Sequence, residues 1–163
     1  MSLMESPPKT TRYAPLLGDL TQRSGAMTAL LISKEGTTIA EGGDTSYMNT
    51  TALAALVAGM FSATREVARM VGEDQFSILL QQGETRHIHI SLISDSRMLI
   101  VIFEDYQRIG RVRHEARKAG EAILAASREE AAATPASAGQ ELGSPHFKEY
   151  ALNLIDRIFV TKS

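Results

Sequence analysis

The chain has 163 residues and a formal net charge of −2, which suits one domain with a further segment appended. This charge provides no overall attraction to phosphate, so we expect no binding to nucleic acid. The sequence contains no cysteine, which excludes disulfides, thiolate metal sites and thiol catalysis and favours the cytoplasm. The longest apolar run, residues 52–61, has about half the length of a bilayer span, so no membrane insertion is expected.

Residues 1–12 lack periodicity and are expected to form a mobile lead-in, of which residues 1–3 resemble a cloning remnant. A short helix is predicted next, because three apolar residues recur at helical spacing before Ser24 and Gly25, and glycine accepts the conformation that ends a helix. These three residues are Leu16, Leu17 and Leu20.

Two short apolar runs then predict a β-hairpin. The first covers residues 27–33 and the second stops at Gly42 and Gly43, with a turn closed by Gly36 between them. A long helix is predicted over residues 47–71. Its candidate N-caps are Asp44, Thr45 and Ser46, and Gly72 follows its last turn.

Three further strands are predicted at residues 76–82, 86–93 and 97–103, and they form an antiparallel meander. The last of these is apolar on both faces from Met98 to Phe103, which indicates a central strand covered by helices above and below. The fold class is therefore α/β (α+β), with a five-stranded antiparallel sheet between helices.

The last helix of the domain is predicted to follow Asp105 as its cap, with an apolar stripe toward the sheet at Ile109, Val112, Ala116, Ala119 and Ile123. The domain thus spans residues 13–126, in the order α-β-β-α-β-β-β-α. Residues 127–143 are rich in Ala, Glu, Pro, Ser and Gly and are expected to form a flexible linker. Residues 144–163 predict an amphipathic helix that docks on another surface through Phe147, Tyr150, Leu154, Ile158 and Phe159.

This order of elements, the hairpin string that begins at Ser24, the Ala-rich second helix and the phrase from Gln75 to Leu80 resemble the Roadblock/dynein light chain family. The added helix at residues 144–163 is similar to that of the longer, bacterial, MglB-like branch. The resemblance implies a domain that regulates or scaffolds a small Ras-like GTPase. It also implies pairing of two copies through the second helix and the third strand, so that two five-stranded sheets become one ten-stranded sheet.

Small residues on one side of the second helix support this pairing, because another helix can approach them closely. An unpaired third strand with apolar side chains would also be an aggregation hazard that a second copy removes. The predicted homodimer interface consists of Ala54, Ala55, Ala58, Gly59, Ser62, Phe76, Ile78 and Leu80. Larger residues of the same helix, namely Leu53, Leu56, Val57, Met60 and Val67, are assigned to the sheet. The alternative is that the small residues pack under a loop.

In the MglB-like branch the paired second helices form the platform for the GTPase. The resemblance places five candidate GTPase-binding residues there: Phe61, Thr64, Arg65, Ala68 and Arg69. An activator works either by inserting an arginine or by reshaping the switch regions of the GTPase, and the resemblance favours reshaping. The alternative is an ordinary exposed helix end with two arginines one turn apart.

No catalytic residues are predicted. The sequence lacks the Gly-x-x-x-x-Gly-Lys-Ser/Thr loop of nucleotide hydrolases, so no cofactor and no hydrolysis of GTP by this chain are expected. His114 and Glu115 fail as a His-Glu-x-x-His motif because the second histidine position holds Lys118. His87 and His89 share one strand face, which allows either a metal site or two half-exposed histidines beneath a helix. No third ligand is evident, and no metal site is predicted.

Five basic residues gather on the last domain helix: Arg108, Arg111, Arg113, Arg117 and Lys118. They form either a surface for an acidic partner or membrane, or a solvated face paired with Glu115 and Glu121. The leading functional hypothesis is a cytoplasmic homodimeric regulator of a small Ras-like GTPase. The alternatives are a passive scaffold or localisation adaptor for a GTPase, and a small-molecule sensor of the PAS or profilin-like shape, which requires a pocket with convergent polar groups.

Overall fold

The computed structural model describes residues 10–133 of the chain. The predicted docking helix at residues 144–163 and residues 134–143 of the predicted linker lie outside this range. The described elements, in chain order, are α1 (Thr10–Ser24), β1 (Thr28–Ser33), β2 (Thr38–Gly43), α2 (Thr50–Met70), β3 (Ile78–Gln82), β4 (His87–Ser94), β5 (Arg97–Phe103), the 3-10 turn η1 (Tyr106–Arg108) and α3 (Ile109–Ala133). The predicted mixed α/β fold and its element order are confirmed.

All five strands form one antiparallel sheet in the order β2-β1-β5-β4-β3. The centre is β5, whose side chains from Met98 to Phe103 are all buried. The prediction of a central strand covered on both faces is therefore confirmed. The two edge strands are β2 and β3.

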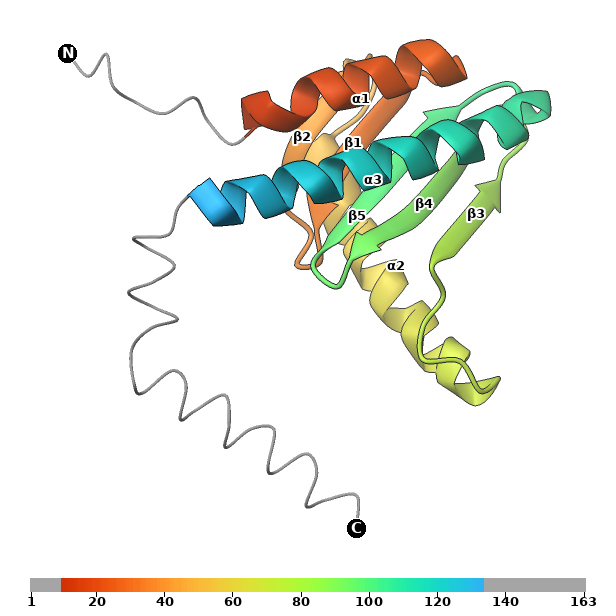
Figure 1. Cartoon of the computed structure of the whole chain (residues 1–163). Coiled ribbons are helices and arrows are strands. Elements are labelled where there is room, and N and C mark those ends of the chain that lie inside the picture. The colour runs from red at the N-terminus through yellow and green to blue at the C-terminus, as the bar shows by residue number, and fades with distance from the viewer. Residues whose placement is uncertain (1–9, 134–163) are drawn as a thin grey trace, which may run out of the picture. The chain divides into compact units, whose positions relative to one another are not determined.

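Helices cover both faces of the sheet: α1 and α3 lie side by side on one face, and α2 lies on the other (Figure 1). The core beneath α2 is formed by apolar side chains of the helix and of β1, β4 and β5, among them Phe61, Leu30 and Ile100. The other face buries Tyr13 and Leu17 of α1 together with the predicted stripe of α3. In that stripe Val112, Ala116, Ala119 and Ile123 are buried, and Ile109 is half-buried.

The start of α2 differs from the prediction. Asn49 is the N-cap, in an extended backbone conformation, and its side-chain oxygen accepts a hydrogen bond from the N–H of Ala52 at 3.1 Å. Asp44 instead accepts hydrogen bonds from the hydroxyl of Ser46 and from its N–H, which lower the pKa of Asp44. The predicted caps thus form a turn before the helix, and α2 begins three residues after Tyr47, at Thr50.

The ends of α1 and α3 extend beyond the predicted bounds. Thr10 starts α1, inside the predicted lead-in, and the helix continues through Pro15. Asp105 caps η1 by accepting a hydrogen bond from the N–H of Gln107 at 3.0 Å, and α3 continues to Ala133. We predicted a linker at residues 127–133, but this segment is helical. The reason is that its Ala, Glu and Arg residues favour helix. None of the described helices is long and apolar enough to cross a membrane.

Candidate protein-interaction surface

The helix α2 has an inner face in the core and an outer face that remains apolar. Ala54, Val57, Phe61 and Ala68 are buried against the sheet. The outer face carries Leu56, Val67 and Met70, which are 72%, 53% and 86% exposed. Exposed Gly59 and Ala63 continue this stripe at helical spacing, and the C-terminal end of α2 extends beyond the sheet (Figure 1). We call Leu56, Gly59, Ala63, Val67 and Met70 the outer stripe.

The structure corrects the predicted faces of α2. Leu56 and Val67, assigned to the sheet, point outward, whereas Ala54, assigned to the dimer interface, is fully buried in the core of its own chain. Phe61 and Ala68, predicted to bind a GTPase, are also buried. The physical reason is that both sides of α2 are apolar, so hydrophobic periodicity alone does not orient the helix.

Ala55 and Ala58 belong to a close approach between α2 and the hairpin turn. Gly36 has φ +93°, and a Cβ atom built there would lie 2.9 Å from Cα of Ala55 and 3.2 Å from Cβ of Ala58. Ala58 is half-buried beside the turn, which is the loop-packing alternative from the sequence, whereas Ala55 approaches the turn through its backbone and stays exposed. On α2, the exposed members of the predicted interface are Ala55, Gly59 and Ser62.

The edge strand β3 adds a second unpartnered feature. It pairs with β4 on one side, and no strand of the described chain pairs with its other side. Ile78 is 46% exposed, Leu80 is half-buried, and Phe76 is half-buried just before the strand begins. A row of free backbone donors and acceptors thus stands beside apolar side chains.

Both arginines of the candidate GTPase platform contact neighbouring residues. Arg69 forms an ion pair with Glu66 at 3.1 Å, and both side chains are exposed. Arg65 is half-buried and donates a long hydrogen bond of 3.5 Å to Gln75, in the segment between α2 and β3. Thr64 is half-buried, and its hydroxyl donates to the carbonyl of Phe61.

Comparison with known proteins identifies the family. The model of the Roadblock/LC7 domain matches residues 14–103, which is more than half of the chain. The chain belongs to the Roadblock/LC7 domain family. No curated protein sequence matches it.

Among solved structures, this Roadblock/LC7 domain is similar to MglB of Myxococcus xanthus, with 26% identity, a TM-score of 0.71, and coverage of 78% of this chain and 96% of that one. The gliding protein MglB of Thermus thermophilus has 27% identity and a TM-score of 0.69, over 78% of this chain and 97% of that one. A Roadblock/LC7 domain from Streptomyces avermitilis shares the fold, with 18% identity, a TM-score of 0.61, and coverage of 69% and 95%.

The two histidines of the Roadblock/LC7 domain lie on the sheet face beneath α3. His87 is 3% exposed and His89 is 1% exposed, and the ring of His87 packs against Phe103 and Tyr106 at centroid distances of 5.3 and 5.1 Å. Within residues 10–133, no three metal-ligating side chains gather around them or elsewhere. Both histidines lie beneath the helix, as in the structural alternative that the sequence left open, but they are buried and not half-exposed as expected.

Sequence reasoning missed the outer stripe and a cavity beside His89. A signal for the stripe was present in the sequence. If Ala54 and Ala68 had been placed toward the sheet, the helical spacing would have turned Leu56, Val67 and Met70 outward. No sequence signal could have found the cavity, because its residues come from α3 and from two strands that meet it only in the fold.

Proposed function

We propose that this Roadblock/LC7 domain forms a homodimer that regulates a small Ras-like GTPase, and that GTP is hydrolysed by the partner. The observation that carries the proposal is the exposed outer stripe of α2, with the open edge of β3 following it in the chain. Large exposed apolar side chains gathered on one helix face are typical of protein-protein interfaces. The structural likeness to MglB over nearly the whole length of two MglB chains supports the assignment to this branch.

A second copy of the chain would cover both features. Pairing of two β3 strands satisfies the open backbone groups, and a two-fold axis then brings the two α2 helices together. Gly59 leaves open space for a neighbouring helix, because no atom lies within 4 Å of a Cβ built there. This is the pairing that the family resemblance implies.

The GTPase would bind on the paired α2 helices, near Thr64, Arg65 and Arg69. We favour action through the shape of this platform over insertion of an arginine. Arg69 is held by Glu66 on the same helix, and Arg65 reaches toward Gln75. Both side chains thus have a partner in their own chain, which each would have to give up to enter the site of a GTPase.

The chain itself is proposed not to be an enzyme. Its sequence holds no phosphate-cradling Gly-x-x-x-x-Gly-Lys-Ser/Thr loop. The isolated protein should therefore neither bind nor hydrolyse GTP, and we place it in the cytoplasm, where Ras-like GTPases act.

The test begins with the GTPase captured from a lysate in the presence of a non-hydrolysable GTP analogue and identified by mass spectrometry. Phosphate release by this purified GTPase is then measured with and without the Roadblock protein. Regulation predicts a faster release, which the exchange Val67→Asp on the outer stripe abolishes. The matched control, Lys118→Asp on α3, should leave the stimulation intact. Phosphate release by the Roadblock protein alone would refute the proposal.

The double variant Arg65→Ala/Arg69→Ala separates the two modes of activation. Stimulation that persists supports reshaping of the switch regions, and its complete loss with binding retained supports an inserted arginine. Binding of the wild-type protein with no change in rate would leave the alternative of a passive scaffold. The sensor alternative requires a pocket with convergent polar groups, and a candidate among the described residues is considered next.

A further inference from the structure

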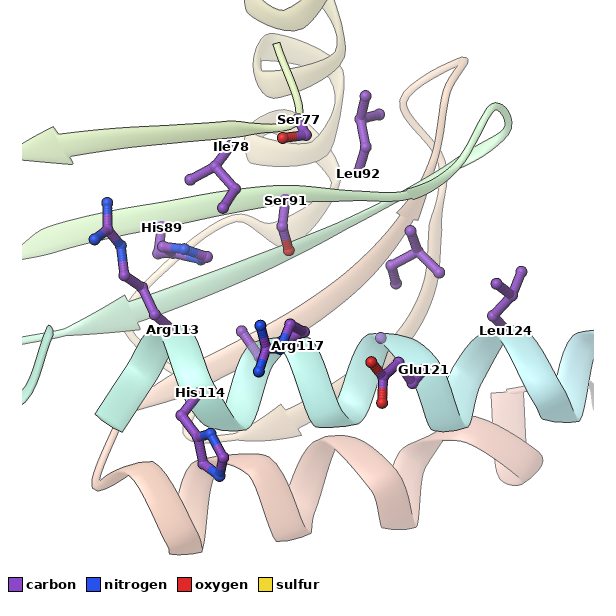
Figure 2. Close-up of a pocket in the computed structure, with 13 residues that line it drawn as sticks. Ser77, Ile78, His89, Ser91, Leu92, Arg113, His114, Arg117, Glu121 and Leu124 are labelled. Atoms are coloured by element: carbon purple, nitrogen blue, oxygen red, sulfur yellow. The ribbon is translucent and has the colours of Figure 1, made fainter. Parts of the chain in front are cut away.

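A cavity of about 670 Å³ lies between α3 and the outer part of the sheet (Figure 2). Its walls are one side of α3, the strand β4 and the start of β3. The polar and charged residues that line it include Ser77, His89, Ser91, Arg113, Arg117 and Glu121. Ile78, Ile93 and Leu124 supply apolar walls. This size and mixed lining are typical of sites for small molecules.

His89 is the unusual member of this lining. His89 is only 1% exposed, yet neither of its ring nitrogens has a hydrogen-bond partner within the described chain. Buried polar groups of folded proteins are nearly always hydrogen-bonded, so such a side chain in a cavity wall indicates a missing partner. A neutral imidazole offers one donor and one acceptor to it.

Arg113 and Arg117 stand one helical turn apart along the same wall. Figure 2 shows Arg113 reaching toward His89, and Arg117 and Ser91 facing the cavity from opposite sides, whereas His114 points away. In the described part of the chain neither arginine forms an ion pair. By contrast, Arg108 pairs with Asp105 and Lys118 with Glu115 on the same helical segment.

The charge of the cavity is therefore positive at the end nearest His89. Glu121 is the one carboxylate among the described lining residues, and it stands a turn beyond Arg117, on the side away from Arg113. Burial and the positive charge of Arg113 both lower the pKa of His89, which keeps the ring neutral at pH 7. Arg113 and Arg117 are exposed to solvent at this wall, whereas His89 is buried. Water can hydrogen-bond to His89, but an anion can accept from His89 and pair with the two arginines at the same time.

We propose that this cavity binds a small organic acid, with its carboxylate or phosphate between Arg113, Arg117 and His89. The apolar part of the ligand packs along Ile78, Ile93 and Leu124. Ser91 and Ser77 supply hydroxyls to its polar atoms. The inference rests on the cavity alone, and it holds whether or not the protein regulates a GTPase.

Three probes test which chemistry the cavity reads. Octanoate carries both a carboxylate and an apolar chain, inorganic phosphate carries the charge alone, and octanol carries the apolar chain alone. Each is titrated into the full chain while backbone amide NMR shifts are followed. We expect octanoate to bind most tightly, phosphate weakly and octanol least, with shifts confined to the residues that line the cavity.

Two variants with matched controls locate the binding. Arg113→Gln/Arg117→Gln should weaken octanoate binding by about tenfold or more, whereas Arg111→Gln, on the same helix outside the cavity, should change it by less than about twofold. Gly120→Leu fills the cavity, because a Cβ built at Gly120 faces Ile93 at 3.7 Å, and it should abolish binding of octanoate. Gly110→Leu is its control, since a Cβ there meets open space.

The NMR spectra report the fold of each variant, so a loss of binding in a well-dispersed spectrum supports the proposal. Equal affinity for octanol and octanoate would overturn it, because the cavity would then not recognise charge. Octanoate shifts that centre on the outer stripe of α2, or unchanged affinity in Gly120→Leu, would overturn it as well.

Discussion

The helices α2 and α3 pack on opposite faces of one sheet, and their inner sides are alike. Val57 and Phe61 of α2 are buried, as are Val112 and Ile123 of α3. Their outer sides differ. The outer side of α3 is a run of charged residues typical of a face in water, while α2 exposes Leu56 and other apolar residues. Covering the sheet explains the apolar inner side of each helix but not the outer stripe of α2. Exposed apolar side chains of this kind are typical of a surface that contacts another protein.

The layers between the sheet and these two helices also differ in polarity. The hydrophobic cluster beneath α2 joins apolar side chains of the helix with those of β1, β4 and β5. The face beneath α3 buries His87 and His89, and a cavity opens beside the second of them. The α2 side of the molecule thus offers an apolar outer stripe suited to a protein, and the α3 side offers a polar cavity suited to a small ligand.

The largest expected effect tests the inner side of α2. Phe61→Ala removes a side chain that is 7% exposed and leaves a cavity under the helix. We expect the free energy of unfolding to fall by about 3 to 5 kcal/mol, measured by urea denaturation. Leu56→Ala, five residues earlier and 72% exposed, should change it by less than about 0.5 kcal/mol in dilute monomer. A small effect of Phe61→Ala would contradict its burial in the core and would support its predicted place on the GTPase-binding surface.

The second prediction tests the outer stripe. Gly59→Arg places a charge in the stripe without any clash in its own chain, and it replaces glycine by a better helix former. We expect the homodimer to weaken by about a hundredfold, or roughly 2.8 kcal/mol, in sedimentation equilibrium. Gly110→Arg makes the same exchange on α3, where a Cβ also meets open space, and should leave association unchanged.

Gly59→Arg is a sharper test than Ala58→Arg, the exchange that the sequence suggests. Ala58 contacts the Gly36 turn, so an arginine there would disturb the fold as well as the surface. A wild-type protein that sediments as a monomer, or an unchanged dimer of Gly59→Arg, would contradict pairing through α2.

The third prediction concerns the approach of the hairpin turn to α2. Gly36→Ala combines a positive φ with a contact of 2.9 Å to the backbone of Ala55, and should destabilise the fold by about 1 to 3 kcal/mol. Gly72 also has a positive φ of +87°, but a Cβ built there meets open space, so Gly72→Ala introduces no close contact. Its cost should be near the strain alone, about 1 kcal/mol. If Gly36→Ala and Gly72→Ala lower the free energy of unfolding equally, in thermal or urea unfolding, the close approach to Ala55 contributes nothing to the cost.

The sequence predicted the fold well because its strands and helices alternate in clear patterns. The run from Met98 to Phe103 is apolar at every position, and this requires a central strand. The stripe of α3 was equally clear, since Val112, Ala116, Ala119 and Ile123 stand among charged residues. Local contrast between polar and apolar positions was present in both segments.

That contrast is missing in α2, which explains the errors there. Apolar residues occupy both sides of this helix, so Ala54 and Leu56 could be exchanged between core and surface without breaking any pattern. Its start was equally ambiguous, because Asp44, Ser46 and Asn49 all have side chains that cap helices. Only the path of the chain after β2 selects Asn49. The cavity depends on side chains of β4 and α3 that lie far apart in sequence.

The smallest predicted effect is a dependence of stability on pH that comes from the α3 side of the sheet. The pKa of His89 is lowered from its ordinary value of 6.5, first by burial and then by Arg113. The unfolded chain therefore binds a proton at His89 at a higher pH than the folded chain does. As the pH falls below about 6.5, the unfolded state gains protons first and the free energy of unfolding decreases.

We expect this loss between about pH 7 and pH 5 in urea titrations, and a shallower slope in His89→Gln. The comparison needs a second histidine as a control. His114 is exposed on α3, so His114→Gln is the matched control for the exchange itself. Because Arg113 opposes the charging of His89, Arg113→Gln should flatten the slope part of the way. Identical slopes for His89→Gln and the wild-type protein would show that His89 binds its proton equally well in the folded and unfolded chains, and would remove the buried histidine as the source of acid sensitivity.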